Sequence, residues 1–210
     1  MAVWFSADLH LGHKRIIELC NRPFTDVATM NDALVERFNE VVAPDDELWL
    51  LGDICMGPLA ESLDVLSRFN GRKILVPGNH DRVSPAYHHK GDRAEKVARF
   101  AAQYLEVFDE IIWKDPWTYN VGAGRDVLLS HFPYVGDSHS DEDRYADLRP
   151  VDTGLPLVHG HVHGEWRERG KMLNVGVDVW GFAPVSLDFV QNWARVAGLP
   201  ERNEDDRGTD

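Results

Sequence analysis

Side chains that can bind metal ions recur at five points along this chain, and each point directly follows a short apolar run. The runs have the length of buried strands, and glycines flank most of the polar positions. The polar residues are Asp8 and His10, then Asp53, then Asn79, His80 and Asp81, then His131, and finally His159, His161 and His163. Because ligand sites in open α/β sheets lie beyond the carboxyl ends of the strands, we expect these five segments to converge.

The donor set is made of carboxylate, amide and imidazole groups, without thiolate. Such a set suits Mn²⁺, Fe, Zn²⁺ or Ni²⁺ better than a structural zinc site. Two divalent ions roughly 3.5–4 Å apart can hold both the attacking and the leaving oxygen of a phosphoryl displacement. Asp53 is the best candidate for a carboxylate shared between two ions, because it stands alone on its turn. Each motif alone could be an ordinary turn or helix cap, but their joint occurrence at strand ends favours a site.

The elements that must position these residues change in character halfway along the chain. In the first half, apolar runs alternate with segments of helical spacing, which predicts a largely parallel α/β sheet. The expected strands there are 2–7, 47–51 and 73–76, and the expected helices are 29–43, 59–69 and 94–108. The second half predicts short strands at 110–113, 117–121, 126–130, 155–159 and 171–175, with a hairpin turn at 122–124, and a closing helix over 186–196 that is strand-like at its start. We expect one domain, residues 1–198, in which a second sheet packs on the first.

The net charge of −13 argues against a basic surface for long nucleic acid, because such a surface must neutralise many phosphates. A small phosphorylated ligand is compatible with this charge, since bound cations reverse the sign of a site locally. Residues 199–210 have no apolar period and predict an acidic, flexible tail. Cys20 and Cys55 lack Cys-x-x-Cys spacing, so we expect buried free thiols in a reducing compartment. We therefore expect a cytoplasmic protein without a membrane partner, and the sequence leaves the oligomeric state open.

Five motifs of this chain resemble those of the calcineurin-like metallophosphoesterases. They are Asp8-Leu9-His10, Gly52-Asp53, Gly78-Asn79-His80-Asp81, Ser130-His131 and Gly160-His161-Val162-His163. They follow the order of that family, and the resemblance extends over about residues 1–185. It implies a four-layer α/β/β/α sandwich and a dinuclear-metal phosphoesterase. One departure is Met56, which stands where many relatives carry an acid.

The resemblance also implies roles for individual residues. One metal ion would be held by Asp8, His10, Asp53 and His163, and the other by Asp53, Asn79, His131 and His161. The attacking group would be a metal-bridging hydroxide, His80 would protonate the leaving oxygen as general acid, and Asp81 would orient His80. We expect two divalent ions, Mn²⁺ first, with Fe, Zn²⁺ and Ni²⁺ as alternatives.

The substrate side of the site is less constrained by the sequence. His13 could contact the substrate phosphate or be a surface histidine at a helix start. Arg144 and Arg149 lie in the irregular segment 132–154, which could read a phosphate or be a surface loop. By analogy with compact bacterial and phage relatives, we expect a small phosphodiester, such as a 2′,3′-cyclic nucleotide. A phosphomonoesterase is the alternative within the same fold, and a non-catalytic binding scaffold is the alternative outside enzymology.

Overall fold

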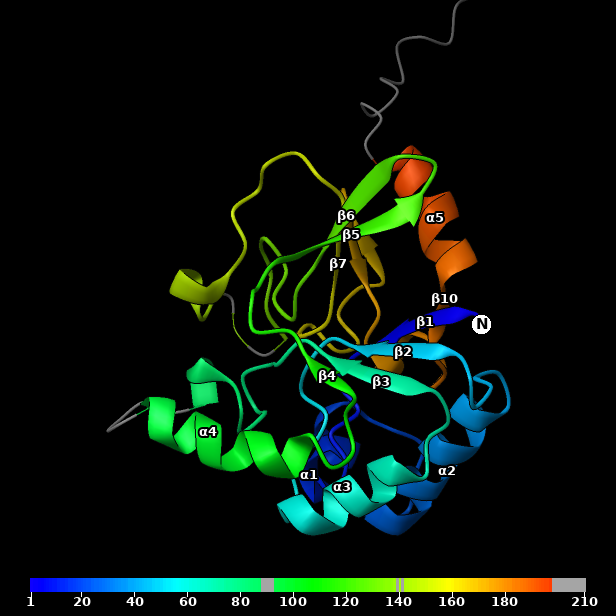
Figure 1. The fold of residues 1–210 in the computed structure, drawn as a ribbon, viewed down its shortest axis with the longest axis vertical. Helices are drawn as coiled ribbons and strands as arrows, with labels where there is room; N and C mark the ends of the chain where they lie inside the picture. The colour runs from blue at the N-terminus through cyan, green and yellow to red at the C-terminus, as the bar shows by residue number, and fades with distance from the viewer. Residues whose placement is uncertain (88–92, 139, 141, 198–210) are drawn as a thin grey trace, which may run out of the picture.

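Two five-stranded sheets face each other in this computed structural model, which describes residues 1–87, 93–138, 140 and 142–197 (Figure 1). The acidic tail expected at 199–210 lies outside the described residues. Helices pack against both sheets, so the predicted α/β/β/α sandwich is confirmed.

The first sheet has the strand order β10-β1-β2-β3-β4. Its strands are β1 (Val3–Ser6), β2 (Glu47–Leu50), β3 (Arg72–Leu75), β4 (Glu110–Ile111) and β10 (Val185–Ser186). β1 to β4 run parallel, and β10 pairs antiparallel with β1 at the edge. Ser6 lies opposite Leu50, and Leu50 lies opposite Leu75, so the three central strands end level with one another. The segments that follow these strands therefore leave the sheet at one edge.

Successive residues of these strands pack into different apolar layers, because side chains alternate across a sheet. In β2, Leu48 and Leu50 face the helices, whereas Trp49 packs between the two sheets. Ile74 and Leu75 of β3 divide in the same way. Both faces are buried, which is why the strands appear in the sequence as continuous apolar runs.

Four helices cover the outer face of this sheet (Figure 1). They are α1 (Lys14–Leu19), α2 (Val27–Asn39), α3 (Leu59–Ser67) and α4 (Arg93–Tyr104). α2 begins after Asp26, whose carboxylate accepts a hydrogen bond from Thr29 N at 2.8 Å. α2, α3 and α4 are predicted from the sequence, although each ends earlier than expected, and of α1 only a helix start at His13 is among the interpretations.

The second sheet has the order β5-β6-β7-β9-β8. Its strands are β5 (Trp117–Gly122), β6 (Arg125–Leu129), β7 (Leu157–His159), β8 (Glu168–Arg169) and β9 (Met172–Asn174). β5 and β6 form the predicted hairpin, and β6, β7 and β9 run parallel. Short 3₁₀ helices occur at η1 (Pro85–Tyr87), η2 (Ala146–Leu148) and η3 (Val177–Val179).

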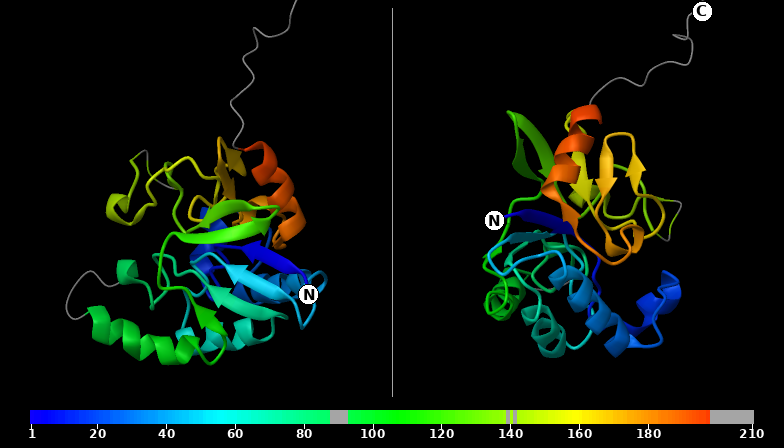
Figure 2. Two further views of the ribbon diagram at one scale, coloured as in Figure 1. Left: turned by 45° about the horizontal axis from the view of Figure 1, so that its top comes forward. Right: turned by 90° about the vertical axis from the view of Figure 1, so that its right-hand side faces the viewer.

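A single described α-helix, α5 (Leu187–Val196), packs against the second sheet, beside β5 of that sheet and β10 of the first (Figure 2). Val190 and Trp193 of α5 belong to the apolar cluster between the sheets. Elsewhere, Tyr134, Leu155 and Trp166 pack on the outward apolar residues of the second sheet. No helix in the described part of the chain has both the length and the apolar composition needed to cross a bilayer.

The two sheets are joined where β1 and β9 end. Ala7 N donates to Val175 O at 3.1 Å, and Val177 N donates to Ala7 O at 3.1 Å. Through these bonds the turn after β1 is fixed against the second sheet, which places the polar motifs of both halves of the chain side by side.

Candidate metal centre

The seven predicted metal ligands lie together beyond the carboxyl ends of the strands, and all are buried. Asp53 is central among them. Its Oδ2 atom is 3.5 Å from His131 Nε2 and 3.9 Å from the Nε2 atoms of His10 and His80. The His10 ring stacks on the ring of His163 with centroids 4.9 Å apart. The rings of His131 and His161 meet edge to face at 5.2 Å, and Asn79 Oδ1 lies 3.0 Å from His131 Nε2.

Five of these residues hold a backbone conformation that side chains other than glycine rarely adopt. The φ angles are +57° at Asp8, +52° at His10, +57° at Asp53, +72° at His161 and +49° at His163. Each such residue costs about 1–3 kcal/mol, the conformation persists only where the surrounding structure enforces it, and such residues concentrate at functional sites. The strain therefore sets these turns apart from ordinary strand connections.

Hydrogen bonds between neighbouring turns hold this strained backbone. Asp8 N donates to Gly52 O, and His10 N donates to Asp53 O, both at 3.0 Å. His161 N donates to Asp8 Oδ2 at 2.9 Å, which ties the turn after β7 to the turn after β1. Each ligand-bearing turn is thus supported by another one.

Asp81 lies beneath the turns and contacts backbone amides rather than the His80 ring. Its Oδ2 accepts from Asp53 N at 2.8 Å and Gly78 N at 2.9 Å, and its Oδ1 accepts from Ile54 N at 3.1 Å. Burial and the neighbouring Asp53 charge raise the pKa of Asp81 to about 7. We expected Asp81 to orient His80, and the described contacts instead give it the task of holding the turn that carries Asp53.

Several buried polar atoms at the centre have no hydrogen-bond partner among the described residues. They include Asp8 Oδ1 and both ring nitrogens of His10. Burial raises the pKa of Asp8 to about 6 and lowers the pKa of His10 well below its usual value. Isolated buried donors and acceptors are unfavourable, and a divalent cation would give these atoms a partner.

The spacing of the donor atoms fits metal ions as well. Donor atoms of Asp8, His10 and His163 lie within 4.8 Å of one another, and so do those of Asp8, Asp53 and His131. The first group contains three of the four ligands expected for one ion. The second group contains Asp53 and His131, which are expected to hold the other ion. It also contains Asp8, which was assigned to the first ion only. The set of nitrogen and oxygen donors suits divalent transition metals.

The ligand histidines His131 and His163 each have a ring nitrogen beside a fixed partner. One of these partners, Asp178, was not indicated by the sequence. His131 Nδ1 lies 2.9 Å from Leu51 O. His163 Nδ1 lies 3.1 Å from Cys20 Sγ and 3.6 Å from the carboxylate of Asp178. Burial by itself would lower the pKa of His163. The contacts with Asp178 and Cys20 outweigh burial and raise this pKa to about 11. A cation at this ring would compete with a proton.

Arg22 anchors Asp178 and was not singled out by the sequence. Its Nε and Nη2 atoms donate to the two oxygens of Asp178 at 2.8 and 2.9 Å. The same guanidinium donates to Leu9 O and Asp8 O at 2.9 and 2.8 Å. Arg22 therefore connects the turn of the first motif to the carboxylate beside His163.

A cavity of about 210 Å³ opens above the ligands. Its walls include ligand residues and the predicted substrate residues His13, His80 and Arg144. The His80 side chain is 37% exposed, and His13 lies at the start of α1 with its ring 5.6 Å from that of His10. His13 therefore begins a helix and also lines the cavity, and its contact with a substrate phosphate stays a prediction.

Two other singled-out residues do not line this cavity. Arg149 donates to the carbonyls of Arg144, Pro133 and Gly136 at 2.7, 3.1 and 2.9 Å, so it shapes the segment 132–154 from within. His159 is buried, with Nδ1 2.7 Å from Gly160 O, and burial lowers its pKa to about 3.

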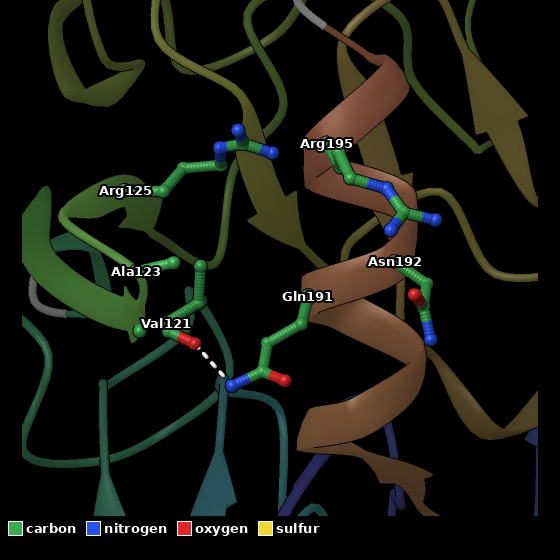
Figure 3. Close-up of a pocket in the computed structure, with 7 residues that line it drawn as sticks. Val121, Ala123, Arg125, Gln191, Asn192 and Arg195 are labelled. Atoms are coloured by element: carbon green, nitrogen blue, oxygen red, sulfur yellow. Dashed lines mark hydrogen bonds between the residues drawn. The ribbon is translucent and has the colours of Figure 1, made fainter.

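A second cavity of about 210 Å³ lies between the β5–β6 turn and α5 (Figure 3). Arg125, Gln191 and Arg195 line it, and none of the predicted ligands does. The Gln191 amide donates to Val121 O, which fastens α5 to the hairpin. This cavity supplies control positions remote from the ligands.

Comparisons with known proteins match this chain to one family and to individual proteins of similar length. A profile of the family described as calcineurin-like phosphoesterase matches residues 1–165. The Gene 66 protein of Mycobacterium phage L5 is 37% identical over 185 residues, covering 85% of this chain and 87% of the phage protein. An uncharacterized protein of Methanocaldococcus jannaschii is 25% identical over 197 residues, covering 90% of this chain and 88% of the archaeal protein. A solved structure of a protein of unknown function from Aquifex aeolicus matches with a TM-score of 0.67 and 27% identity, covering 91% of this chain and 98% of that one.

The tight packing of the turns predicts that Gly52→Ala disrupts the centre. A Cβ at Gly52 would lie 2.5 Å from Gly78 N and 2.6 Å from His131 Nδ1, at a φ of +84°. Gly124 shares a positive φ of +68° but has open space around it, so Gly124→Ala is the matched control. We expect both variants to lose about 1–2 kcal/mol through backbone strain. Gly52→Ala should lose roughly 1–3 kcal/mol more through overpacking, together with its metal affinity. Urea unfolding and calorimetric titration with Mn²⁺ measure both effects, and equal behaviour of the two variants would contradict the packing argument.

Proposed function

Because this chain belongs to the calcineurin-like phosphoesterase family and is therefore a metal-dependent hydrolase of phosphoesters, we propose that it cleaves small phosphodiesters with two bound divalent ions. We propose Mn²⁺ as the native metal, with Fe, Zn²⁺ and Ni²⁺ as alternatives. The observation that carries the proposal is Asp53 Oδ2, which faces three histidines within 3.9 Å beside the unpartnered Asp8 Oδ1.

The proposed ligands of the two ions share Asp53. One set adds Asp8, His10 and His163, and the other adds Asn79, His131 and His161. Divalent ions at such a site supply Lewis acidity, offsetting the charge of a phosphoester and making water a better nucleophile. Asp53 suits the shared position, since its Oδ1 accepts from His80 N at 2.8 Å while its Oδ2 faces the histidines.

His80 is the proposed general acid. Its backbone amide is held by Asp53, and its partly exposed ring lies at the cavity, 5.7 Å from the ring of His10. Burial lowers the pKa of His80, and the Asp53 charge partly opposes this effect. A phosphate anion beside the ring would favour the protonated form, which a general acid needs to protonate the leaving oxygen.

The walls of the cavity support a small nucleotide-like diester, such as a 2′,3′-cyclic nucleotide. Arg144 and Arg15 offer positive charge for a phosphate. Leu19 and Met56 provide an apolar surface for a base. Leu19 and Met56 are 47% and 36% exposed, so this surface is open to a ligand.

We further propose that the enzyme works in the cytoplasm on soluble substrates, without long nucleic acid or membrane as partner. The net charge of −13 supports this proposal, since it opposes binding to polyanions. The thiols of Cys20 and Cys55 are free, which is compatible with a reducing compartment.

The activity is tested on metal-stripped protein with Mn²⁺ restored. Bis-p-nitrophenyl phosphate, p-nitrophenyl phosphate and 2′,3′-cyclic AMP are compared as substrates. We expect Mn²⁺-dependent turnover that is faster on the two diesters than on the monoester. Turnover of the monoester alone would replace the diesterase proposal with a phosphomonoesterase. Absence of turnover on all three would refute the small-substrate proposal.

Asp53 and His80 should separate metal binding from chemistry. Asp53→Ala is expected to lose bound metal and turnover together, because both ions lose a shared ligand. His80→Ala should retain the metal content of the wild type while turnover falls by about 10²–10⁴-fold, the usual contribution of general acid–base catalysis. Metal content is measured by elemental analysis beside the kinetics. Unchanged turnover of His80→Ala on a diester with a poor leaving group would remove its assigned role.

Arg144 should contribute to substrate binding. Its Nε and Nη2 atoms contact Asp137, which leaves Nη1 without a described partner. We expect Arg144→Gln to raise KM for the diester by about tenfold, the loss expected for a hydrogen bond to a charged group. Arg125→Gln, in the remote cavity of Figure 3, is the control and should match the wild type. Equal KM values for the two variants would place Arg144 outside the substrate site.

A further inference from the structure

Described residues of the segment 132–154 lie against the metal centre, where Tyr145 meets the His161 ring edge to face, and the side chain of Asp137 has no exposed surface. We propose that Asp137 is a positioning residue, which fixes the His161 ring in the tautomer needed for metal binding and holds Arg144 at the substrate cavity. The inference rests on the proposed function, because it concerns how the same site is assembled.

The contacts of Asp137 involve both of its oxygens. Oδ2 lies 3.1 Å from His161 Nε2 and accepts from Arg149 Nη2 at 3.3 Å. Oδ1 accepts from Arg144 Nη2 at 2.5 Å and from Ser138 N at 2.8 Å. Two guanidinium groups therefore keep the carboxylate charged in a buried position, which is the arrangement that a buried ion requires.

The carboxylate determines which nitrogen of His161 carries the proton. An ionised carboxylate only accepts hydrogen bonds, so the Nε2 atom facing it must be the donor. A neutral imidazole has one protonated nitrogen, and the lone pair is then left on Nδ1. Metal-binding histidines commonly donate their other ring N–H to a carboxylate or a carbonyl in this way.

Two other ligand histidines, His131 and His163, likewise have one ring nitrogen beside an oxygen atom of the protein. His131 Nδ1 faces Leu51 O, and His163 Nδ1 faces the carboxylate of Asp178. In both, the nitrogen held in this way is Nδ1, and Nε2 of His131 faces the side chains of Asn79 and Asp53. His161 is reversed, since its Nε2 is held and its Nδ1 is left. The partner of His161 is Asp137, which belongs to the same surface segment as Arg144.

The same carboxylate links metal binding to substrate binding. Arg144 reaches the cavity while its Nε and Nη2 atoms contact Asp137. Arg149 joins Asp137 to the carbonyls of Pro133 and Gly136, which stiffens the segment around it. A change at Asp137 should therefore weaken metal binding and raise KM together, whereas Arg144→Gln should raise KM alone.

The first test uses the metal-free wild-type protein. Two-bond ¹H–¹⁵N correlation spectra report which ring nitrogen of each histidine is protonated, and the spectrum of His161→Gln identifies the His161 signals. We expect the Nε2–H tautomer at His161. The Nδ1–H tautomer would overturn the proposal, and this measurement requires neither a bound metal nor a folded Asp137 variant.

The second test compares Asp137→Asn with Asp143→Asn in the same segment. Asp143 Oδ1 accepts from Gly136 N at 2.7 Å and is the matched control, because it supports the segment through a backbone amide. We expect Asp137→Asn to lower the affinity for Mn²⁺ by roughly 10–100-fold in calorimetric titration, and Asp143→Asn to retain the wild-type affinity. Unchanged affinity in Asp137→Asn would overturn the inference, as would an equal loss in both variants. If the wild type itself binds no Mn²⁺, the proposed function fails, and the tautomer of His161 still decides the role of Asp137.

Discussion

Three backbone amides converge on the Asp81 carboxylate, and the geometry of the metal centre depends on this interaction. The amides of Asp53, Ile54 and Gly78 come from the turns after two neighbouring strands, so one buried side chain joins both turns. With the turn fixed, one oxygen of Asp53 accepts from His80 N, and the other is directed toward the histidines. The parallel strands supply the common edge, but the carboxylate beneath them sets how the side chains at that edge face one another.

The location of the centre could be predicted from the sequence because its ligands are tied to strand ends. A buried parallel strand is visible as an apolar run, and the polar residue that follows it must lie at the carboxyl edge of the sheet. The residues that hold the ligands gave no such signal. Arg22 and Asp178 are 156 positions apart, and neither follows a strand of the first sheet. Asp137 lies in an irregular segment whose path is set by tertiary contacts, so no local pattern indicates its approach to His161.

The helices show the same division between local and tertiary information. α2 was predictable because it is long, has regular apolar spacing and begins at an aspartate cap. α1 has six residues, and His13 at its start makes no side-chain cap hydrogen bond. Its buried Ile16 packs into the cluster under the first sheet, and such packing rather than propensity stabilises a helix this short. The role expected for Asp81 illustrates a further limit, because a motif indicates that a carboxylate is present but not which donors it accepts.

The left-handed backbone of the ligand residues has a consequence for the evolution of this fold. Glycine tolerates positive φ without strain, so replacing Asp8, His10 or His163 by glycine would remove a ligand and relieve strain in one step. The two ring nitrogens of His10, which have no hydrogen-bond partner, would also be removed by such a replacement. Selection for catalysis therefore works against selection for stability at these positions. In the metal-free protein such replacements would raise the free energy of unfolding, so a lineage released from selection for catalysis would have a stability incentive to give up its ligands.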